Sequence, residues 1–187
     1  MTAKLPLCRI FTDGSCYKPA EGDGIGGWCA VVAASGWRKL LWGAEGDTTT
    51  NRCELHPIVA GVRYLLDRLE DPAAHRVEVY SDSEYTIRRL SDPAGDRAVD
   101  YRQFKGDRAT LQSRNMHMWV ELGGMAELFG SVRYIWVPRN SNYYNEFCDG
   151  MASSIYVSAR NMMMSLYGTR YLVPSEAVSL DNPFPEA

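Results

Sequence analysis

The hydrophobic pattern of the chain is strand-like before residue 50 and helix-like after it. Three short apolar runs come first: Leu7–Thr12, Trp28–Ala34 and Lys39–Ala44. The first run ends at Asp13-Gly14, and the second and third are joined by Ser35-Gly36, which is typical of a hairpin. Gly24–Gly27 is interpreted as a glycine-rich turn. The first 46 residues therefore predict three antiparallel strands.

Residues 52–69 instead repeat apolar side chains at spacings of three and four, which predicts an amphipathic helix. Proline fits easily only in the first turn, so this helix either begins near Glu54 or is kinked at Pro57. The later elements are expected at Val77–Tyr80, Ser83–Leu90, Met116–Leu128, Val132–Val137 and Tyr144–Ala159. Strands followed by alternating α and β segments favour an α/β (α+β mixed) fold, with a mixed sheet and helices on its faces.

The length of 187 residues fits one domain, expected at 1–160, and a C-terminal extension at 161–187. We expect the extension to be partly packed and partly flexible. Apolar residues make up 45% and charged residues 23%, which allows a packed core. There is no stretch of 18 apolar residues, and residues 1–8 do not resemble a signal peptide. A cytoplasmic protein without a membrane partner is therefore expected.

The five cysteines are odd in number and show no CxxC spacing, which argues against a zinc site and a disulfide framework. Cys8 and Cys29 fall in apolar runs and are interpreted as small core residues. The formal net charge is −3, and many nucleic-acid binders are basic instead. A site that holds metal ions could still supply positive charge locally.

Four carboxylates are the candidate chemistry: Asp13, Glu54, Asp82 and Asp149. Asp13 and Asp82 each follow a predicted strand, so they would lie side by side if those strands are neighbours. Glu54 and Asp149 belong to predicted helices and could face the same point. Carboxylates this close repel one another, and bound Mg²⁺ removes the repulsion. The pattern therefore predicts a site for two metal ions and phosphoryl transfer.

Each carboxylate also has a simpler interpretation. Asp13-Gly14 could be a turn, Asp82-Ser83 a helix N-cap, and Glu54 a favourable first-turn charge. Thr48–Asn51 could likewise be an ordinary polar helix start. None of these explains why the neighbouring residues also match one pattern.

The pattern consists of Thr-Asp-Gly-Ser-Cys, Thr-Thr-Asn-Arg-Cys-Glu-Leu, Ser-Asp-Ser-Glu-Tyr and, after Trp-Val, Asn-Glu-Phe-Cys-Asp, over about residues 5–160. In these motifs the chain resembles type 1 ribonuclease H. The resemblance implies a five-stranded sheet and endonucleolytic cutting of RNA in an RNA–DNA hybrid, which leaves 5′-phosphate and 3′-hydroxyl ends. It implies two Mg²⁺ ions, with Mn²⁺ as a substitute. The implied catalytic metal ligands are Asp13, Glu54, Asp82 and Asp149. The implied hybrid contacts are Gly14, Ser15, Cys16, Thr49, Thr50 and Asn51, and short polar groups suit recognition of a 2′-hydroxyl.

Three features depart from the family pattern. Asn140 stands where the family usually has a loop histidine that helps the product to leave. Residues 91–114 are nearly charge-balanced and contain no Trp, where many members have a basic protrusion. Glu84 adds negative charge next to Asp82. We therefore expect slow turnover and weak hybrid binding, or a partner that supplies the binding.

Two other classes of function stay open. A DNA nuclease or resolvase can use the same fold, although the Thr-Thr-Asn segment argues against it. A non-catalytic nucleic-acid-binding module is the second, and the presence of all four carboxylates argues against that. We expect a monomer, with 91–114 or 161–187 as the places for a protein partner. His56 is expected to be a structural or surface residue, because on a helix it would point away from Glu54.

Overall fold

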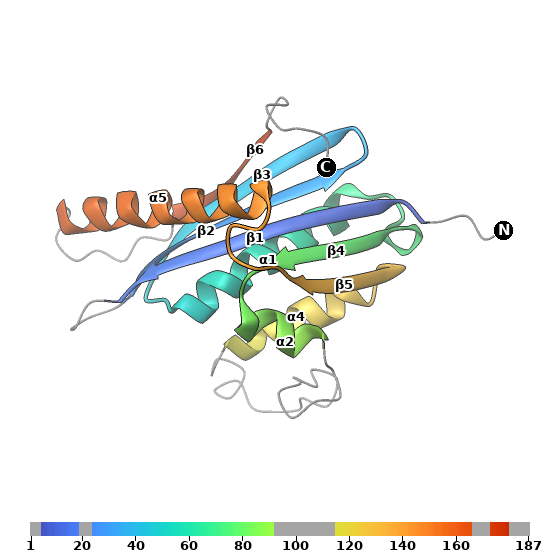
Figure 1. The fold of residues 1–187 in the computed structure, drawn as a ribbon, viewed down its shortest axis with the longest axis horizontal. Coiled ribbons are helices and arrows are strands. Elements are labelled where there is room, and N and C mark those ends of the chain that lie inside the picture. Colours follow the sequence, from blue (N-terminus) through green and yellow to red (C-terminus); the bar gives the residue numbers. More distant parts are fainter. Residues whose placement is uncertain (1–4, 19–23, 92–114, 166–172, 180–187) are drawn as a thin grey trace.

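The computed structural model describes residues 5–18, 24–91, 115–165 and 173–179. Six strands form one sheet in the order β5-β4-β1-β2-β3-β6 (Figure 1). Their bounds are β1 Leu7–Tyr17, β2 Ile25–Ala34, β3 Trp37–Gly46, β4 Arg76–Ser81, β5 Ser131–Trp136 and β6 Val173–Ser179. Strands β1, β4 and β5 run parallel, and the remaining neighbours are antiparallel. The sheet is therefore mixed, with β1 joining its two parts.

Helices cover both faces of the sheet (Figure 1). Helix α5 (Tyr143–Ser165) lies on one face, and α1 (Thr50–Arg68), α2 (Glu84–Ser91) and α4 (Met116–Ala126) lie on the other. A 3-10 turn, η1 (Pro72–Ala74), precedes β4. Because side chains alternate along a strand, β1 and β2 contribute to two cores. Ile10, Ala30 and Val32 face α1, whereas Phe11, Cys29 and Val31 face α5.

The predicted fold class is confirmed: a mixed sheet with three leading antiparallel strands and helices on both faces. A sixth strand was not expected. β6 pairs antiparallel with β3, from Lys39↔Ser179 to Ala44↔Val173. It contains Pro174, which an edge strand tolerates because one side of its backbone has no strand neighbour. Helix α5 also continues past its predicted end at Ala159, since residues 160–165 contain neither glycine nor proline.

Two predicted boundaries near the site were wrong. β1 does not end at Thr12, because it stays paired with β2 as far as Tyr17↔Ile25. Gly26 and Gly27 lie inside β2 instead of forming a turn. A Cβ on Gly27 would overlap with the backbone of α5 at Ala152. The glycine therefore serves close packing of helix on strand, and a turn is not needed to explain it.

Helix α1 starts before Glu54, at Thr50, and Pro57 lies within it. Thr49 is the N-cap, and its hydroxyl accepts the amide of Arg52 at 3.3 Å. Pro57 has no N–H to donate to the Cys53 carbonyl, the group one turn earlier. Its ring is buried against the core, which offsets the loss. None of the described helices is long and apolar enough to span a membrane.

Candidate active site

Asp13 and Asp82 lie side by side because their strands are parallel neighbours. Pairing of β1 with β4 runs from Leu7↔Arg76 to Phe11↔Tyr80 and goes no further. Asp13 comes just past the last pair, while β1 remains held by β2 through Asp13↔Cys29. Asp82 directly follows β4. The two carboxylates therefore project where β1 and β4 separate, as the sequence predicted.

Asn145 connects the same point to helix α5. Its side-chain amide donates to the carbonyls of Thr12 and Tyr80, each at 3.3 Å, and the residue is buried. The backbone N–H of Asn145 donates to Oδ1 of Asn142 at 3.0 Å, which caps the start of the helix. The amide thus takes the place of strand-to-strand hydrogen bonds between β1 and β4. It also fixes the start of α5, so that Asp149 lies one turn further along beside the two strand ends.

Glu54 reaches the site from α1 on the other face of the sheet. Oxygen atoms of Asp13, Glu54 and Asp82 all lie within 4.8 Å of one another. One Glu54 oxygen, Oε2, is buried and has no hydrogen-bond partner. Hard divalent cations prefer carboxylate oxygens, and a buried carboxylate oxygen without a donor is costly. These three residues therefore fit a Mg²⁺ or Mn²⁺ ion.

The crowding of negative charge changes the protonation of the carboxyls. Burial, and then the charges of Asp82 and Asp149, raise the pKa of Asp13 from 3.8 to about 7, although the Gly14 amide at 2.6 Å lowers it. Burial, and then the negative charges of Asp13 and Asp82, raise the pKa of Glu54 well above its ordinary value. Burial also raises the pKa of Asp82. Without a cation, the site holds protons that a metal ion would displace.

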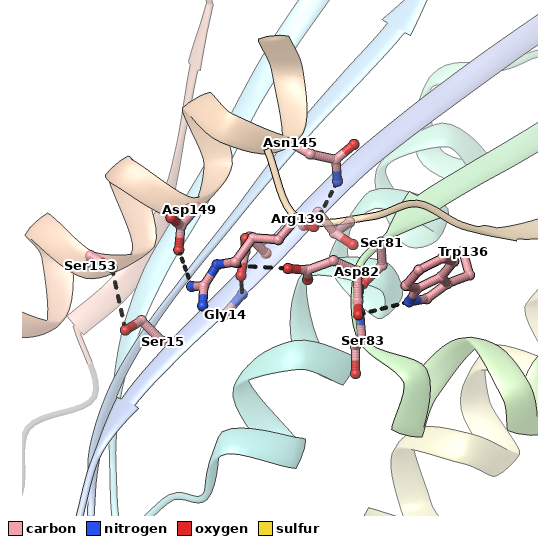
Figure 2. Close-up of polar contacts among 12 residues, drawn as sticks. Gly14, Ser15, Ser81, Asp82, Ser83, Trp136, Arg139, Asn145, Asp149 and Ser153 are labelled. Atoms are coloured by element: carbon pink, nitrogen blue, oxygen red, sulfur yellow. Dashed lines mark hydrogen bonds and ion pairs between the residues drawn. The ribbon is translucent and has the colours of Figure 1, made fainter. Parts of the chain in front are cut away.

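Asp149 is paired with an arginine. Arg139, on the loop between β5 and α5, donates from Nη2 to Asp149 Oδ1 at 2.8 Å, and its Nε lies 4.0 Å from Asp82 Oδ2 (Figure 2). Among the described residues, Asp149 does not join the three-carboxylate group. The structure therefore brings all four predicted carboxylates together, three of them directly and the fourth through Arg139.

The simpler interpretations of the carboxylates do not hold. Ser83 caps α2, because its hydroxyl accepts the Thr86 amide at 3.3 Å, so the cap does not need the Asp82 side chain. The Trp136 indole N–H donates to the Asp82 carbonyl at 3.0 Å and fixes its backbone (Figure 2). The first turn of α1 contains no acidic residue, and Asp13 lies in a strand.

The candidate hybrid contacts occupy one side of the site. Gly14, Ser15 and Cys16 continue β1 beyond Asp13. Thr49, Thr50 and Asn51 are exposed at the start of α1. The Cys16 thiol lies 3.9 Å from the carbonyl of Thr48, the residue that precedes them, so the two segments are neighbours.

Glu45 on β3 holds the start of α1 in place. Its buried carboxylate accepts hydrogen bonds from Thr48 Oγ1 at 3.1 Å and Arg52 Nε at 2.8 Å, and it contacts His56 Nδ1. Burial opposes ionisation, but the hydrogen bonds and charges of His56 and Arg52 lower the pKa of Glu45 to about 2. His56 also stacks on Trp28, which confirms that it is structural. Nothing in the sequence pattern singles out Glu45, since its partners meet only in the folded chain.

The departures from the family pattern have structural counterparts. Glu84 pairs with Arg88 one turn along α2, at 3.0 Å, so its charge is partly compensated. Asn140 is exposed and has a left-handed backbone with φ of 57°. Residues 92–114 lie outside the described ranges.

Arg139 and Asn145 were missed as site residues, because an arginine or asparagine near a loop has no periodic pattern that reveals its partners.

Comparisons with known proteins agree on one family. A family model described as RNase H matches residues 7–156. A ribonuclease H of Thermoanaerobacter sp. is 30% identical over 156 residues, covering 82% of this chain and 92% of that protein. One from Neorickettsia sennetsu is 31% identical over 155 residues, covering 81% and 94%.

Solved structures share the fold. LC9-RNase H1, described as a type 1 RNase H with the type 2 active-site motif, matches with a TM-score of 0.65 at 22% identity, over 84% of this chain and 75% of that one. LC11-RNase H1 in complex with an RNA/DNA hybrid matches with a TM-score of 0.56 at 20% identity, over 82% and 99%.

Proposed function

Because the chain belongs to the ribonuclease H family, we propose that it is an endonuclease that hydrolyses the RNA strand of RNA–DNA hybrids. The observation that carries the proposal is the set of carboxylates at the end of β4. Asp13, Glu54 and Asp82 have oxygens within 4.8 Å of one another, and Asp149 faces them from α5 through Arg139. Carboxylates gathered around the ends of two strands suit metal-assisted phosphodiester hydrolysis.

Each carboxylate has a distinct proposed part. Asp13 lies at the centre and would ligate both ions; Glu54 and Asp82 would hold one ion, and Asp149 the other. When bound, two Mg²⁺ ions activate the attacking water and stabilise the leaving 3′-oxygen, which gives 5′-phosphate and 3′-hydroxyl ends. Mn²⁺ has the same preference for oxygen ligands and is a proposed substitute.

The hybrid would lie over β1 and the start of α1. Gly14 and Ser15 offer backbone groups, and Cys16, Thr49, Thr50 and Asn51 offer short side chains. Groups of this size can reach a 2′-hydroxyl in a minor groove, which is what separates RNA from DNA. In the LC11-RNase H1 structure, a protein of the same fold is in complex with an RNA/DNA hybrid.

A single panel of substrates tests the proposal. A labelled RNA–DNA hybrid, duplex DNA, duplex RNA and single-stranded RNA are each incubated with Mg²⁺ or Mn²⁺, and the product ends are identified. We expect cutting of the hybrid RNA only, with 5′-phosphate ends. Preferential cutting of duplex DNA would support a DNA nuclease or resolvase instead, and binding without cutting would support a non-catalytic module.

Asp13→Asn tests the site itself. The variant keeps the size of the side chain but removes its charge, so cutting should be lost while hybrid binding is kept. Asp67→Asn is the control, because Asp67 is exposed on α1 among residues outside the site. Robust cutting by Asp13→Asn would contradict the assignment.

A further inference from the structure

Among the residues that the structure describes, Arg139 is the one cation in direct contact with the site carboxylates. Its guanidinium links the end of β4, through Asp82, to helix α5, through Asp149 (Figure 2). Its positive charge lowers the pKa of Asp13 and of Glu54, although burial and the neighbouring carboxylates outweigh it. Arg139 therefore offsets part of the repulsion in this site.

The four carboxylates differ in how easily a cation can reach them. Asp13, Glu54 and Asp82 already form a group of oxygens that a cation could enter. At Asp149 the guanidinium donates directly to Oδ1, at 2.8 Å. A guanidinium has only donors and cannot ligate a metal ion, and its charge repels one. An ion that binds Oδ1 of Asp149 must therefore displace the guanidinium, and an ion at the other oxygen would be repelled by its charge.

The surrounding loop allows that movement without a change of fold. The backbone on both sides is anchored: the Val137 amide donates to Ser81 at 3.1 Å, and Asn142 caps α5. Between these anchors, the Arg139 side chain is 68% exposed. A long exposed side chain exchanges rotamers quickly. Only the side chain has to turn into solvent.

We propose that Arg139 is an internal counterion that competes with a metal ion for Asp149, so that the two ions bind in sequence and with unequal affinity. The inference rests on the proposed two-metal function and adds a regulating residue to it. The first ion enters at Asp13, Glu54 and Asp82. The second has to displace Arg139 from Asp149, and its affinity is reduced by the strength of that ion pair. Arg139 is a positioning residue in this scheme, since it acts on Asp149.

Calorimetric titration of the full chain with Mn²⁺, without nucleic acid, tests the proposal. The wild-type protein should bind two ions, the second more weakly. Arg139→Gln should strengthen the second step by about fivefold and change the first step less, because an exposed ion pair contributes no more than about that factor. Arg139→Lys keeps the charge and should stay close to the wild type.

Arg133→Gln is the matched control. Arg133 is also 68% exposed, and it pairs with Glu78 at 3.5 Å on the neighbouring strand, outside the carboxylate group. Its Mn²⁺ binding should not differ from that of the wild type. Melting of the metal-free proteins adds a second measurement. Arg139→Gln should melt below the wild type near neutral pH, and saturating Mn²⁺ should remove the difference.

The possible outcomes separate the two proposals. If the wild type binds two ions and Arg139→Gln leaves the second step unchanged or weaker, the role of Arg139 is wrong and the proposed function stands. If Arg139→Gln strengthens both steps equally, its placement at Asp149 is wrong. If the wild type binds no ion while properly folded, the two-metal function fails, and this inference fails with it.

Discussion

Gly14 on β1 and Cys53 on α1 are in backbone contact directly behind the carboxylates. An ideal Cβ on Gly14 would overlap with the carbonyl group of Cys53 and come too close to the Glu54 amide. The absent side chain is what allows the helix to lie so near the strand. The position of Glu54 relative to Asp13 therefore depends on a glycine.

Gly14→Ala should push α1 away from β1 and displace Glu54. We expect a loss of about 1–3 kcal/mol of stability, as for other overpacked sites, together with weaker Mn²⁺ binding. Gly124→Ala on α4 is the control, because nothing lies within 4 Å of its Cβ position. It should leave stability unchanged or raise it by up to about 1 kcal/mol. Denaturant unfolding and Mn²⁺ titration measure both, and a Gly14→Ala protein as stable as the wild type would contradict the close contact.

The stability of the metal-free protein should fall as pH rises from about 4 to about 7. Asp13 has an ordinary pKa of 3.8 and a folded-state pKa of about 7, so in this window the folded state binds more protons than the unfolded state. Its stabilising contribution is complete below pH 3.8 and is lost by about pH 7. The raised pKa of Glu54 acts in the same direction.

Thermal melts with EDTA at intervals across this pH range measure the effect. Asp13→Asn should flatten the slope, and Mg²⁺ should restore stability most at the high end of the range. Glu45 acts with the opposite sign, because its pKa is lowered from 4.5 to about 2, so its contribution is lost as pH falls through about 2. A metal-free protein that gains stability between pH 4 and 7 would show that the carboxyls are not crowded as described.

Glu45→Gln should weaken hybrid binding more than it slows the chemical step. The carboxylate binds Thr48, Arg52 and His56, so its loss loosens the start of α1, where Thr49, Thr50 and Asn51 lie. We expect a higher KM, a smaller change in kcat, and about 1–3 kcal/mol less stability. Glu45→Asp should recover part of the KM if the charge is what matters.

Glu121→Gln is the comparison for that variant. Glu121 forms an exposed pair with Arg63 on the outer side of α1, and such pairs contribute less than about 1 kcal/mol. Its KM should equal that of the wild type. A change in kcat alone at Glu45→Gln would argue that Glu45 has some other role.

Asn140→His should raise the steady-state rate of hybrid cutting. Asparagine does not titrate near neutral pH, whereas histidine does, and the resemblance to the family implies a histidine here that helps the product to leave. The left-handed backbone at this residue suits histidine nearly as well as asparagine, so the fold should be kept. Multiple-turnover rates should increase while single-turnover rates stay the same. An unchanged or lower steady-state rate would argue against a role in product release.

The sequence predicted what local patterns determine. Asp13 and Asp82 follow strands with recognisable apolar runs, and Glu54 lies in a helix with a clear period, so three carboxylates could be placed before the fold was known. Arg139 could not, because its direction depends on two carboxylates from other elements. Gly26 and Gly27 were misassigned for a related reason. Each lacks a side chain because another element packs closely against it, Cys53 of α1 against Gly26 and helix α5 against Gly27. Residues 173–179 have no alternation of apolar and polar side chains and contain a proline, so the strand becomes evident only from its pairing with β3.

Strand β6 also changes what the sheet offers to other molecules. An unpaired strand edge is a template on which a second chain can add its own strand, and this is a common route to aggregation. With β6 in place, β3 is an interior strand, and the outermost strand contains Pro174, which cannot donate a hydrogen bond. Strand β6 thus covers the β3 edge, and a chain shortened to residue 160 would expose it.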